Sequence, residues 1–533
     1  MIVKIYGPPG TGKTTTLNKL INKYKDRIPM KQIMFVSFSN AAIDAIFTKM
    51  GIDYNKNTTR KYPYFRTLHG LCLSYLMSNG YHKEFSRMFG IPGFIDETYA
   101  RFCRKNKIPY SYDITSEALG NQAISSWMKI VGEYYPKYSM GKCLDILHSK
   151  DVKQYNAILK WLKYKKENGI YDWIDIETMS FEKEINFGMY KKPPRIVFFD
   201  EAQDFSPLEW KLIDYIIDGI ETVYFAGDDM QAIYAFKGSK AEEFLNYKCD
   251  EEIVLPKSYR LPSALVDYSN KIMELTRNKK WKEIIPAREG GKVVVFDNRV
   301  TIQHIVDVAL QYHELYPNDS IYILFRTNYQ ASQAQDYLIS KGILYKTLKA
   351  DKVWNEDVPV LYSIFVKKKH GIKLSIEEIR KIVELLPLDL STKRKFNNVL
   401  DGGVVPISIS TKLQSIDLVK LIAENRKLKK AFFSKVKVGG ANVPIIDILL
   451  ESAKNQKMPN VNISIDTMHA SKGLEADVVF IADGLTQNTL KSIKTEGIDN
   501  ELRTYYVAST RARKLLCVYP LAEATPFISQ VIK

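Results

Sequence analysis

The sequence predicts an α/β fold built on parallel sheets, and three observations support this prediction. An apolar, β-prone segment at residues 1–6 leads into a glycine-rich loop, and residues 15–24 then show helical spacing of leucine and isoleucine. A second apolar run, residues 196–199, leads into two acidic residues. Further runs of β-formers lie at 321–325 and 478–482. Short apolar runs of this kind, alternating with helices, are typical of parallel strands that are buried on both faces.

The glycine-rich loop at residues 7–14 reads Gly-Pro-Pro-Gly-Thr-Gly-Lys-Thr, a complete G-x-x-x-x-G-K-[ST] phosphate loop between a strand and a helix. Its glycines let the backbone amides and the helix N-terminus surround a phosphate. We expect Lys13 to reach the β- and γ-phosphates of ATP and Thr14 to ligate Mg²⁺. The residues expected to contact the nucleotide here are Gly7, Pro8, Pro9, Gly10, Thr11, Gly12, Lys13, Thr14 and Thr15.

The acidic pair Asp200-Glu201 follows a predicted buried strand, as the second half of an ATP site does. We expect Asp200 to hold the magnesium shell and Glu201 to orient and deprotonate the attacking water. Taken alone, such a pair is also compatible with a plain helix N-terminus. Together with the phosphate loop it predicts hydrolysis of ATP, because an acidic base beside Mg·ATP activates water rather than a small acceptor.

A further strand at 221–226 is followed by a segment that carries polar and aromatic side chains in close succession. Gln231 can hydrogen-bond both water and a γ-phosphate. Tyr234, Phe236 and Lys237 come directly after it, which suggests coupling between the nucleotide and a stacked base. The alternative is that the two rings are ordinary core or surface residues beside a lysine.

Composition narrows the class of protein without deciding it. The chain has 533 residues, enough for three or four compact units, and no apolar run approaches the roughly 18 residues of a membrane span. Its five cysteines form no C-x-x-C pair, so we expect neither a disulfide framework nor a zinc site, and a cytoplasmic location fits best. The net charge of +17 favours a polyanionic partner, although a lysine-rich solvated surface would give the same value.

The ordered motifs resemble those of the UvrD/Rep group of superfamily 1 DNA helicases over the whole length of the chain. The combination G-D-D-x-Q-x-I-Y and, later, T-x-H-x-x-K-G-L-E is similar to the 3′-to-5′ branch of that group. Beyond the phosphate loop, D-E-A-Q-D and G-D-D-M-Q-A-I-Y, the matching motifs are V-S-F-S-N-A-A at 36–42, T-L-H-G at 67–70, S-Y-R at 258–260, L-F-R-T-N at 324–328, T-M-H-A-S-K-G-L-E at 467–475 and Y-Y-V-A-S-T-R-A at 505–512.

The resemblance implies two RecA-like P-loop cores with parallel sheets, each carrying a mainly helical inserted subdomain, and ATP hydrolysis in the cleft between the cores. It implies the following boundaries: 1–90 and 191–275 for the first core, 91–190 for a helical insertion over the DNA, 276–360 and 458–533 for the second core, and 361–457 for a second insertion.

The resemblance also implies roles for single residues. Tyr259 would stack on the adenine, Arg260 and Arg511 would contact the γ-phosphate, and Glu475 would accept from the ribose hydroxyl. The residues implied along single-stranded DNA are Phe38, Asn40, His69, Tyr234, Phe236, Lys237, Arg326 and His469. The alternatives are a surface ion pair for each arginine, a core position for Phe236, and a satisfied buried histidine for His69 and His469.

The chain departs from the family pattern at three places. Only six residues precede Gly7, where relatives usually carry a glutamine that reads the adenine edge, so we expect weaker discrimination among purine triphosphates. Thr15 stands where relatives often have arginine. The chain ends soon after Arg511, so we expect a compact member without the C-terminal extension.

The leading hypothesis is an ATP-dependent DNA helicase that moves 3′-to-5′ on single-stranded DNA and uses Mg²⁺. Its expected partners are single-stranded DNA and single-/double-stranded junctions, and we expect a monomer in the cytoplasm, associated with the nucleoid, or in a host cytoplasm if the source is viral. An alternative is an ATP-switched nucleic-acid-binding module of a repair or defence complex that does not unwind processively. A P-loop kinase is disfavoured by Glu201 and the two arginines.

Overall fold

The chain divides into two compact units, Met1–Lys292 with Leu490–Thr510, and Val293–Thr489 with Arg511–Lys533. Residues 276–292 and 490–510 therefore group with the first unit, whereas we expected them in the second core. The computed structural model describes residues 1–52, 58, 61–81, 94–110, 118–188, 192–341, 345–348, 364, 367, 374–385, 435–438, 441–444 and 462–532.

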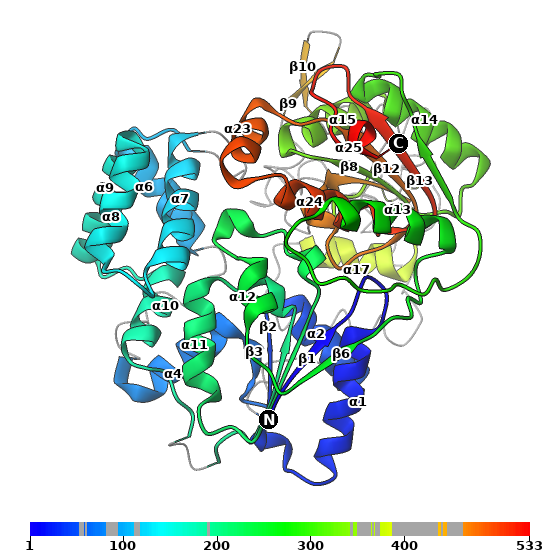
Figure 1. Cartoon of the computed structure of the whole chain (residues 1–533). Coiled ribbons are helices and arrows are strands. Elements are labelled where there is room, and N and C mark those ends of the chain that lie inside the picture. The colour runs from blue at the N-terminus through cyan, green and yellow to red at the C-terminus, as the bar shows by residue number, and fades with distance from the viewer. Residues whose placement is uncertain are drawn as a thin grey trace, which may run out of the picture. The chain divides into compact units, whose positions relative to one another are not determined.

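Six parallel strands form the sheet of the first unit (Figure 1). Strands β2 and β4 inside the sheet are buried at every position, because helices cover both faces. The parallel α/β core and its apolar strands are confirmed. In order across the sheet the strands are β3 (Phe65–Thr67), β2 (Ile33–Ser37), β4 (Ile196–Asp200), β5 (Thr222–Gly227), β1 (Ile2–Tyr6) and β6 (Glu251–Val254).

Alternate side chains of these strands enter two separate hydrophobic cores, one on each face of the sheet. Phe35, for example, packs in one core and its neighbour Val36 in the other. This is the period of two that a strand imposes on its side chains. The helices that complete these cores are α1 (Lys13–Lys25) and α2 (Asn40–Lys49) on the first face, and α4 (Leu68–Leu76) and α11 (Pro207–Ile217) on the second.

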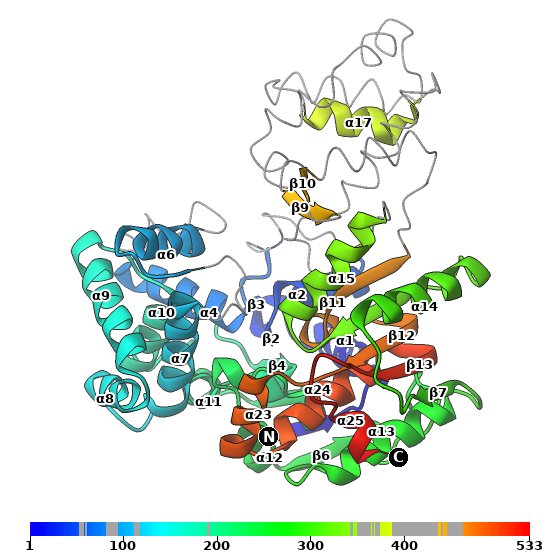
Figure 2. The same ribbon diagram turned by 90° about the horizontal axis from the view of Figure 1, so that it is seen from above.

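Helices α6 to α10, which lie between β3 and β4 in the sequence, form a separate group (Figures 1 and 2). This group has a hydrophobic core of its own. The helical pattern predicted for 91–190 is thus confirmed for the described residues 94–110 and 118–188. The helices are α6 (Phe94–Lys105), α7 (Leu119–Tyr134), α8 (Met140–Lys150), α9 (Val152–Asn168) and α10 (Trp173–Glu182).

The buried face of α9 includes a charged residue and leaves an apolar one exposed. Leu159 is 37% exposed, whereas Trp161 and Lys165 are buried. The Lys165 ammonium is buried because it donates to the carboxylates of Asp172 and Asp175, each over 2.7 Å. A paired charge can thus occupy a core position that a hydrophobic pattern does not predict.

The second unit contains a five-stranded sheet whose first four strands are parallel. The strands predicted at 321–325 and 478–482 are confirmed as β8 and as part of β12. Helices α14 (Ile302–Leu315) and α15 (Asn328–Ser340) pack against this sheet. The strand order is β11 (Ile463–Thr467), β8 (Ile321–Phe325), β12 (Ala476–Asp483), β13 (Ala512–Pro520) and β7 (Lys292–Val295).

Most of the predicted second insertion, 361–457, lies outside the described residues. Within it, α17 (Ile376–Leu385) and an antiparallel pair, β9 (Lys435–Val438) with β10 (Ala441–Pro444), are described. In the described part of the chain, no helix has both the length and the apolar character needed to cross a lipid bilayer. The remaining helices are α12 (Ala241–Asn246), α13 (Ser263–Leu275), α23 (Gln487–Glu496), α24 (Asp499–Ser509) and α25 (Ile528–Val531).

Candidate functional site

The predicted site residues of the first unit follow the carboxyl ends of its parallel strands. Because all six strands run in the same direction, these ends meet at one edge of the sheet, where open α/β sheets bind their ligands. The phosphate loop follows β1, Phe38 follows β2, His69 follows β3, Glu201 follows β4 and Asp228 follows β5. Parallel pairing therefore gathers segments that are far apart in sequence.

The phosphate loop is folded back on itself around Lys13. Gly10 and Gly12 have φ angles of 76° and 80°, in the left-handed region that favours glycine, and α1 begins directly after Gly12. The Lys13 ammonium donates to the Gly7 carbonyl oxygen over 2.6 Å. A Cβ atom at Gly7 would lie 2.3 Å from Lys13 Cγ, so only glycine leaves room for this lysine.

The acidic pair lies against the first turn of α1. Thr14 Oγ1 donates to Asp200 Oδ2 over 3.1 Å, and Asp200 is 1% exposed. Burial, followed by the charge of Glu201, raises the pKa of the Asp200 carboxyl group to about 6. A buried carboxylate beside a hydroxyl group is a fitting pair of oxygen ligands for Mg²⁺, which would also relieve the cost of burying that charge.

Glu201 is held at the strand end by its neighbours in the D-E-A-Q-D motif. Its φ angle is 55°, an uncommon value for a residue with a side chain, and it turns the chain sharply after β4. Gln203 Nε2 donates to Glu201 Oε2 over 2.6 Å. The sequence motif contains Gln203 but does not indicate its role, which is to orient the predicted base.

Gln203 also connects the acidic pair to the segment after β5. Its Oε1 atom accepts from the backbone N–H of Asp228 over 2.9 Å. The carboxylate of Asp228 in turn accepts from Gln231 Nε2 over 2.7 Å, and Gln231 is buried. Glu201 and Gln231, the predicted base and the predicted γ-phosphate contact, are therefore joined by a continuous chain of hydrogen bonds through Gln203 and Asp228.

The S-Y-R motif packs directly on the phosphate loop. The backbone N–H of Tyr259 donates to the Gly10 carbonyl oxygen over 2.8 Å, and Ser258 Oγ donates to the Pro9 carbonyl oxygen over 2.9 Å. The Tyr259 side chain is 68% exposed, as a stacking surface must be. Arg260 is half-buried, and its Nη1 atom donates to the Thr510 carbonyl oxygen over 3.4 Å.

Aromatic rings gather beside Gln231. The rings of Phe38 and Tyr234 are stacked, with centroids 5.0 Å apart and planes 16° apart. Lys237 Nζ lies 5.4 Å from the Phe38 centroid and 5.3 Å from that of Tyr234. Phe236 meets Tyr234 edge-on at 6.0 Å and is 43% exposed, which excludes the core interpretation of this ring.

The remaining predicted DNA contacts of the first unit occupy the starts of two helices. Asn40 is the first residue of α2 and is exposed, and Ser39 caps that helix through the N–H of Ala42. His69 Nε2 lies 2.6 Å from Glu177 Oε1, and the His69 side chain is 32% exposed. It is thus a paired histidine that still reaches the surface.

Burial and the carboxylate of Glu177 shift the pKa of His69 in opposite directions. Burial alone would lower the pKa of the His69 imidazole, but the carboxylate of Glu177 outweighs burial and raises it. Glu209 lies next to this pair, and burial raises the pKa of its carboxyl group to about 7. Ligand atoms of these three residues lie within 4.8 Å of one another, but the direct contact of His69 with Glu177 and the capping bond of Glu209 to Ser206 account for the arrangement.

Two of the site residues predicted in the second unit follow the carboxyl ends of neighbouring strands. Phe325 of β8 and Thr467 of β11 are paired in register, and they are followed by Arg326 and, two positions on, His469. Both side chains are half-buried, so the interpretation of His469 as a fully buried histidine is excluded.

Glu475 directly precedes β12, and Arg511 directly precedes β13. Arg511 is 1% exposed, and its Nη1 atom donates to the Leu474 carbonyl oxygen over 3.2 Å. Glu475 Oε1 accepts from Arg513 Nη1 over 3.2 Å. The ion pair with Arg513 was missed from sequence, although Arg513 stands only two residues beyond the motif arginine.

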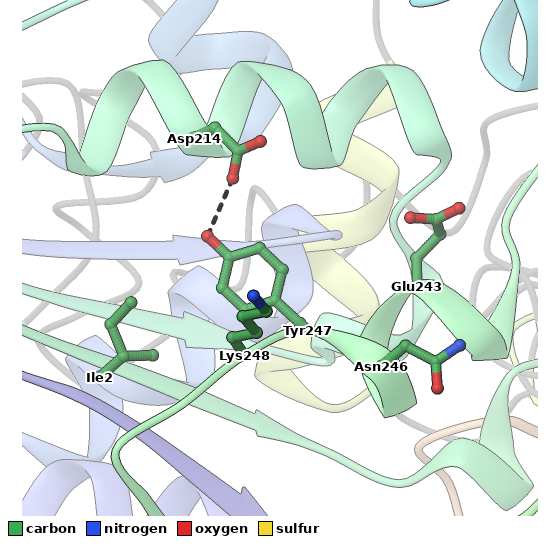
Figure 3. Close-up of a pocket in the computed structure, with 6 residues that line it drawn as sticks. All are labelled: Ile2, Asp214, Glu243, Asn246, Tyr247 and Lys248. Carbon is green, nitrogen blue, oxygen red and sulfur yellow. Dashed lines mark hydrogen bonds between the residues drawn. The ribbon is translucent and has the colours of Figure 1, made fainter.

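A separate pocket of about 360 Å³ opens at the other end of β1, away from the phosphate loop (Figure 3). It contains none of the predicted site residues. The Tyr247 hydroxyl group donates to Asp214 over 2.9 Å, so these two polar groups satisfy each other. We assign this pocket no role. Its lining residues are Ile2, Asp214, Glu243, Asn246, Tyr247 and Lys248.

Comparison with known proteins gives matches along most of the chain. Residues 2–252 match the family model of the UvrD/REP helicase N-terminal domain, and residues 411–521 match that of the UvrD-like helicase C-terminal domain. The chain is similar to a probable DNA helicase II homolog of Mycoplasma capricolum, with 24% identity over 96% of this chain and 81% of the relative. It is also similar to the ATP-dependent DNA helicase PcrA of Staphylococcus epidermidis, with 21% identity over 96% and 80%, and to the ATP-dependent DNA helicase Rep of Buchnera aphidicola, with 22% identity over 74% and 71%.

Proposed function

This chain belongs to the UvrD/Rep helicase family, and we propose that it moves 3′-to-5′ along single-stranded DNA and separates the duplex ahead of it. The family assignment makes it an ATP-dependent DNA helicase. The polarity, the preference for single strands and junctions, and the roles of single residues are the proposal.

In the proposed ATP site, each described residue has one task. Lys13 neutralises the β- and γ-phosphates once nucleotide draws its ammonium away from the Gly7 carbonyl oxygen. Thr14 and Asp200 would hold Mg²⁺, which would supply charge neutralisation at the phosphates. Glu201, oriented by Gln203, accepts the proton of the attacking water.

Tyr259 offers its exposed ring to the adenine base, and Arg260 is placed by the packing of its motif on the phosphate loop. Arg511 and Glu475 belong to the second unit, and their tasks at the γ-phosphate and the ribose stay predictions of the motifs. Arg326 and His469 are proposed as DNA contacts of the second unit, because they follow paired positions of two neighbouring strands.

The observation that carries the proposal is the stacked pair Phe38 and Tyr234 with Lys237 above it. Tyr234 and Lys237 stand three and six residues beyond Gln231 in the sequence. Exposed rings with a nearby cation are the surface on which bases of a single strand stack. Because Gln231, Tyr234 and Lys237 belong to one short segment, and Tyr234 stacks on Phe38, a change at the γ-phosphate reaches the stacking surface directly. This adjacency supports a motor in which hydrolysis alternately tightens and loosens the grip on bases.

Unwinding of tailed duplexes tests the proposal. A duplex with a 3′ single-stranded tail should be separated when ATP and Mg²⁺ are present, whereas one with a 5′ tail and a blunt duplex should not. Glu201→Gln serves as the control, since it should bind the same substrates without separating them. Equal separation of both tailed substrates, or of the 5′-tailed one alone, would refute the proposed polarity.

A further inference from the structure

Lys282 is a fully buried lysine that no motif contains. Its side chain is 0% exposed, as are those of Asp228 and Asp229. Its Nζ atom lies 3.1 Å from Asp228 Oδ1 and also pairs with the carboxylate of Asp229. Burying a lysine is costly unless its charge is paired, so this position needs a specific reason.

The two carboxylates keep this lysine charged. Burial alone would lower the pKa of the Lys282 ammonium, but Asp228 and Asp229 outweigh burial and raise it. The backbone N–H of Lys280 donates to Asp229 Oδ2 over 3.1 Å, so the same segment contacts this carboxylate twice. The segment at 280–282 is thereby fixed on the G-D-D-M-Q motif.

Asp228 is the link between this lysine and the ATP site. Its Oδ1 atom faces Lys282, whereas its Oδ2 atom accepts from Gln231 Nε2 over 2.7 Å. Rotation of the carboxylate would therefore move the amide group of Gln231. Lys282 and the backbone N–H of Met230, which donates to Oδ1 over 3.2 Å, together hold one oxygen and so set the direction in which the other presents its lone pairs.

We propose that Lys282 is a positioning residue for hydrolysis: through Asp228 it fixes Gln231 in the orientation that meets the γ-phosphate. This inference rests on the proposed function, because it requires Gln231 to act at the nucleotide. Lys282 itself touches neither nucleotide nor water. Loss of Lys282 should therefore lower the kcat of ATP hydrolysis rather than the affinity for ATP.

The segment that carries Lys282 is anchored at its other end as well. The carboxylate of Asp499, at the start of α24, accepts from the N–H groups of Arg277 and Asn278 over 3.2 and 2.9 Å. Arg503 Nη2 on the same helix donates to the Asn278 carbonyl oxygen over 2.5 Å. Lys282 therefore holds Asp228 from a support that is itself fixed, as a positioning residue requires.

A purely structural ion pair is the competing explanation, and Lys4 provides a matched control. Lys4 is also buried at 1% exposure in the same unit, and its ammonium donates to the Leu245 carbonyl oxygen over 2.9 Å and pairs with Glu252. None of its described contacts is with Asp228, Asp229 or Gln231. Lys4 shares two neighbours with the segment 280–282, the Tyr6 ring and Glu252. Lys4→Met therefore removes a buried lysine from the same surroundings while leaving the carboxylates that hold Gln231 with their partners.

Four variants test the inference: Lys282→Met, the charge-balanced pair Lys282→Met/Asp229→Asn, Lys4→Met and Gln231→Ala. The balanced pair avoids leaving an extra unpaired charge in the core, so it keeps the test possible if Lys282→Met does not fold. For each variant, Tm, the Kd of a non-hydrolysable ATP analogue, and the kcat of DNA-stimulated ATP hydrolysis are measured.

We expect both Lys282 variants to lose at least about tenfold in kcat, the loss that corresponds to roughly one positioned hydrogen bond in the transition state. Their affinity for the analogue should stay within about threefold of wild type, because Lys13 and Thr14 are intact. Lys4→Met should lose thermal stability and keep its kcat.

The decisive step adds the balanced pair to the Gln231→Ala background. If Lys282 acts through Gln231, this addition lowers kcat no further, whereas an independent structural effect multiplies the two losses. Multiplied losses, or a folded balanced pair with wild-type kcat while Gln231→Ala is impaired, would overturn the inference alone. Wild-type kcat in Gln231→Ala would instead refute the proposed role of Gln231, and the inference with it.

Discussion

Thr14 Oγ1 donates a hydrogen bond to Asp200 Oδ2 over 3.1 Å, although 186 positions of the sequence separate the two residues. Thr14 lies in the first turn of α1 and Asp200 ends β4, and β5 lies between β4 and β1 in the sheet. The contact thus spans one strand and joins the phosphate loop to the acidic pair. Both oxygen atoms suit Mg²⁺, which makes this contact the centre of the proposed ATP site.

Lys13→Ala and Glu201→Gln should both abolish ATP hydrolysis, but at different steps. Lys13 supplies charge to the bound phosphates, so its loss should also weaken nucleotide binding. Glu201→Gln keeps the size of the side chain and removes only the base, so binding should survive. Equilibrium binding of an ATP analogue beside steady-state turnover separates the two, and robust turnover by Glu201→Gln would refute the assignment of the base.

Gly10→Ala should disrupt the phosphate loop. Gly10 has a φ angle of 76°, and a Cβ atom there would lie 2.5 Å from Arg260 Cβ and 2.9 Å from Ser258 Oγ. The substitution therefore adds a clash to an unfavourable backbone angle, and it should lower both Tm and nucleotide affinity.

Gly51→Ala is the matched control for that change. Gly51 has a φ angle of 68°, but a Cβ atom there meets nothing within 4 Å. It should show the backbone cost alone, about 1 kcal/mol, and normal nucleotide affinity. Equal behaviour of the two variants in both measurements would show that the packing of the S-Y-R motif on the loop does not matter.

The sequence motifs predicted the residues of the ATP site that stand next to strand ends, but not the buried lysine that supports them. Lys13, Thr14 and Asp200 could be placed from sequence because each stands next to a strand end, and parallel strands bring such ends together. Lys282 lies 53 positions from Asp229, in a segment without periodicity or a motif, and only tertiary packing brings it to the site.

The same distinction applies to the helices of the insertion. The family resemblance predicted that 91–190 would be helical but not which face α9 buries, because Lys165 enters the core through its pairing with Asp172 and Asp175. Likewise, His69 was visible in the T-L-H-G motif, whereas its partner Glu177 is provided by a helix more than a hundred residues away in sequence. Pairing partners of charges follow from the fold rather than from local pattern.

Phe236→Ala should reduce DNA binding and its stimulation of ATP hydrolysis without unfolding the protein. The ring is 43% exposed, so its loss leaves little cavity and Tm should change little. Loss of one stacking surface should cost roughly 1–3 kcal/mol per base contacted. Because the lysine contacts to phosphates remain, the slope of DNA affinity against salt should be unchanged.

Tyr316→Ala, which truncates another exposed ring at 53%, is the control for that variant. It should leave the DNA-stimulated rate at the wild-type value. A large drop in the Tm of Phe236→Ala, with normal stimulation of the folded protein, would contradict the stacking role.

Glu177→Gln should destabilise the protein more at pH 6 than at pH 9. Glu177 raises the pKa of the His69 imidazole above its ordinary value of about 6.5. The pair therefore stabilises the folded state below about pH 6.5, and this contribution is lost as the pH rises through the folded pKa. At pH 9 the substitution also relieves repulsion between Glu177 and Glu209, which further reduces its cost.

Thermal melting of wild type and Glu177→Gln at the two pH values checks this expectation. Histidine NMR, with His69→Gln to assign the signal, should show a lower pKa for His69 in the variant. An equal loss of Tm at both pH values, together with an unchanged His69 pKa, would show that the contact does not charge the histidine.

Displacement of streptavidin from biotinylated single-stranded DNA tests the central claim most directly, because it reports movement and its direction without a duplex. With ATP and Mg²⁺, the protein should strip streptavidin from a 5′ biotin and leave a 3′ biotin occupied, and Glu201→Gln should strip neither. Displacement from the 3′ end alone would contradict the proposed polarity. Displacement from neither end, with DNA-stimulated ATP hydrolysis intact, would contradict the motor and favour an ATP-switched DNA-binding module.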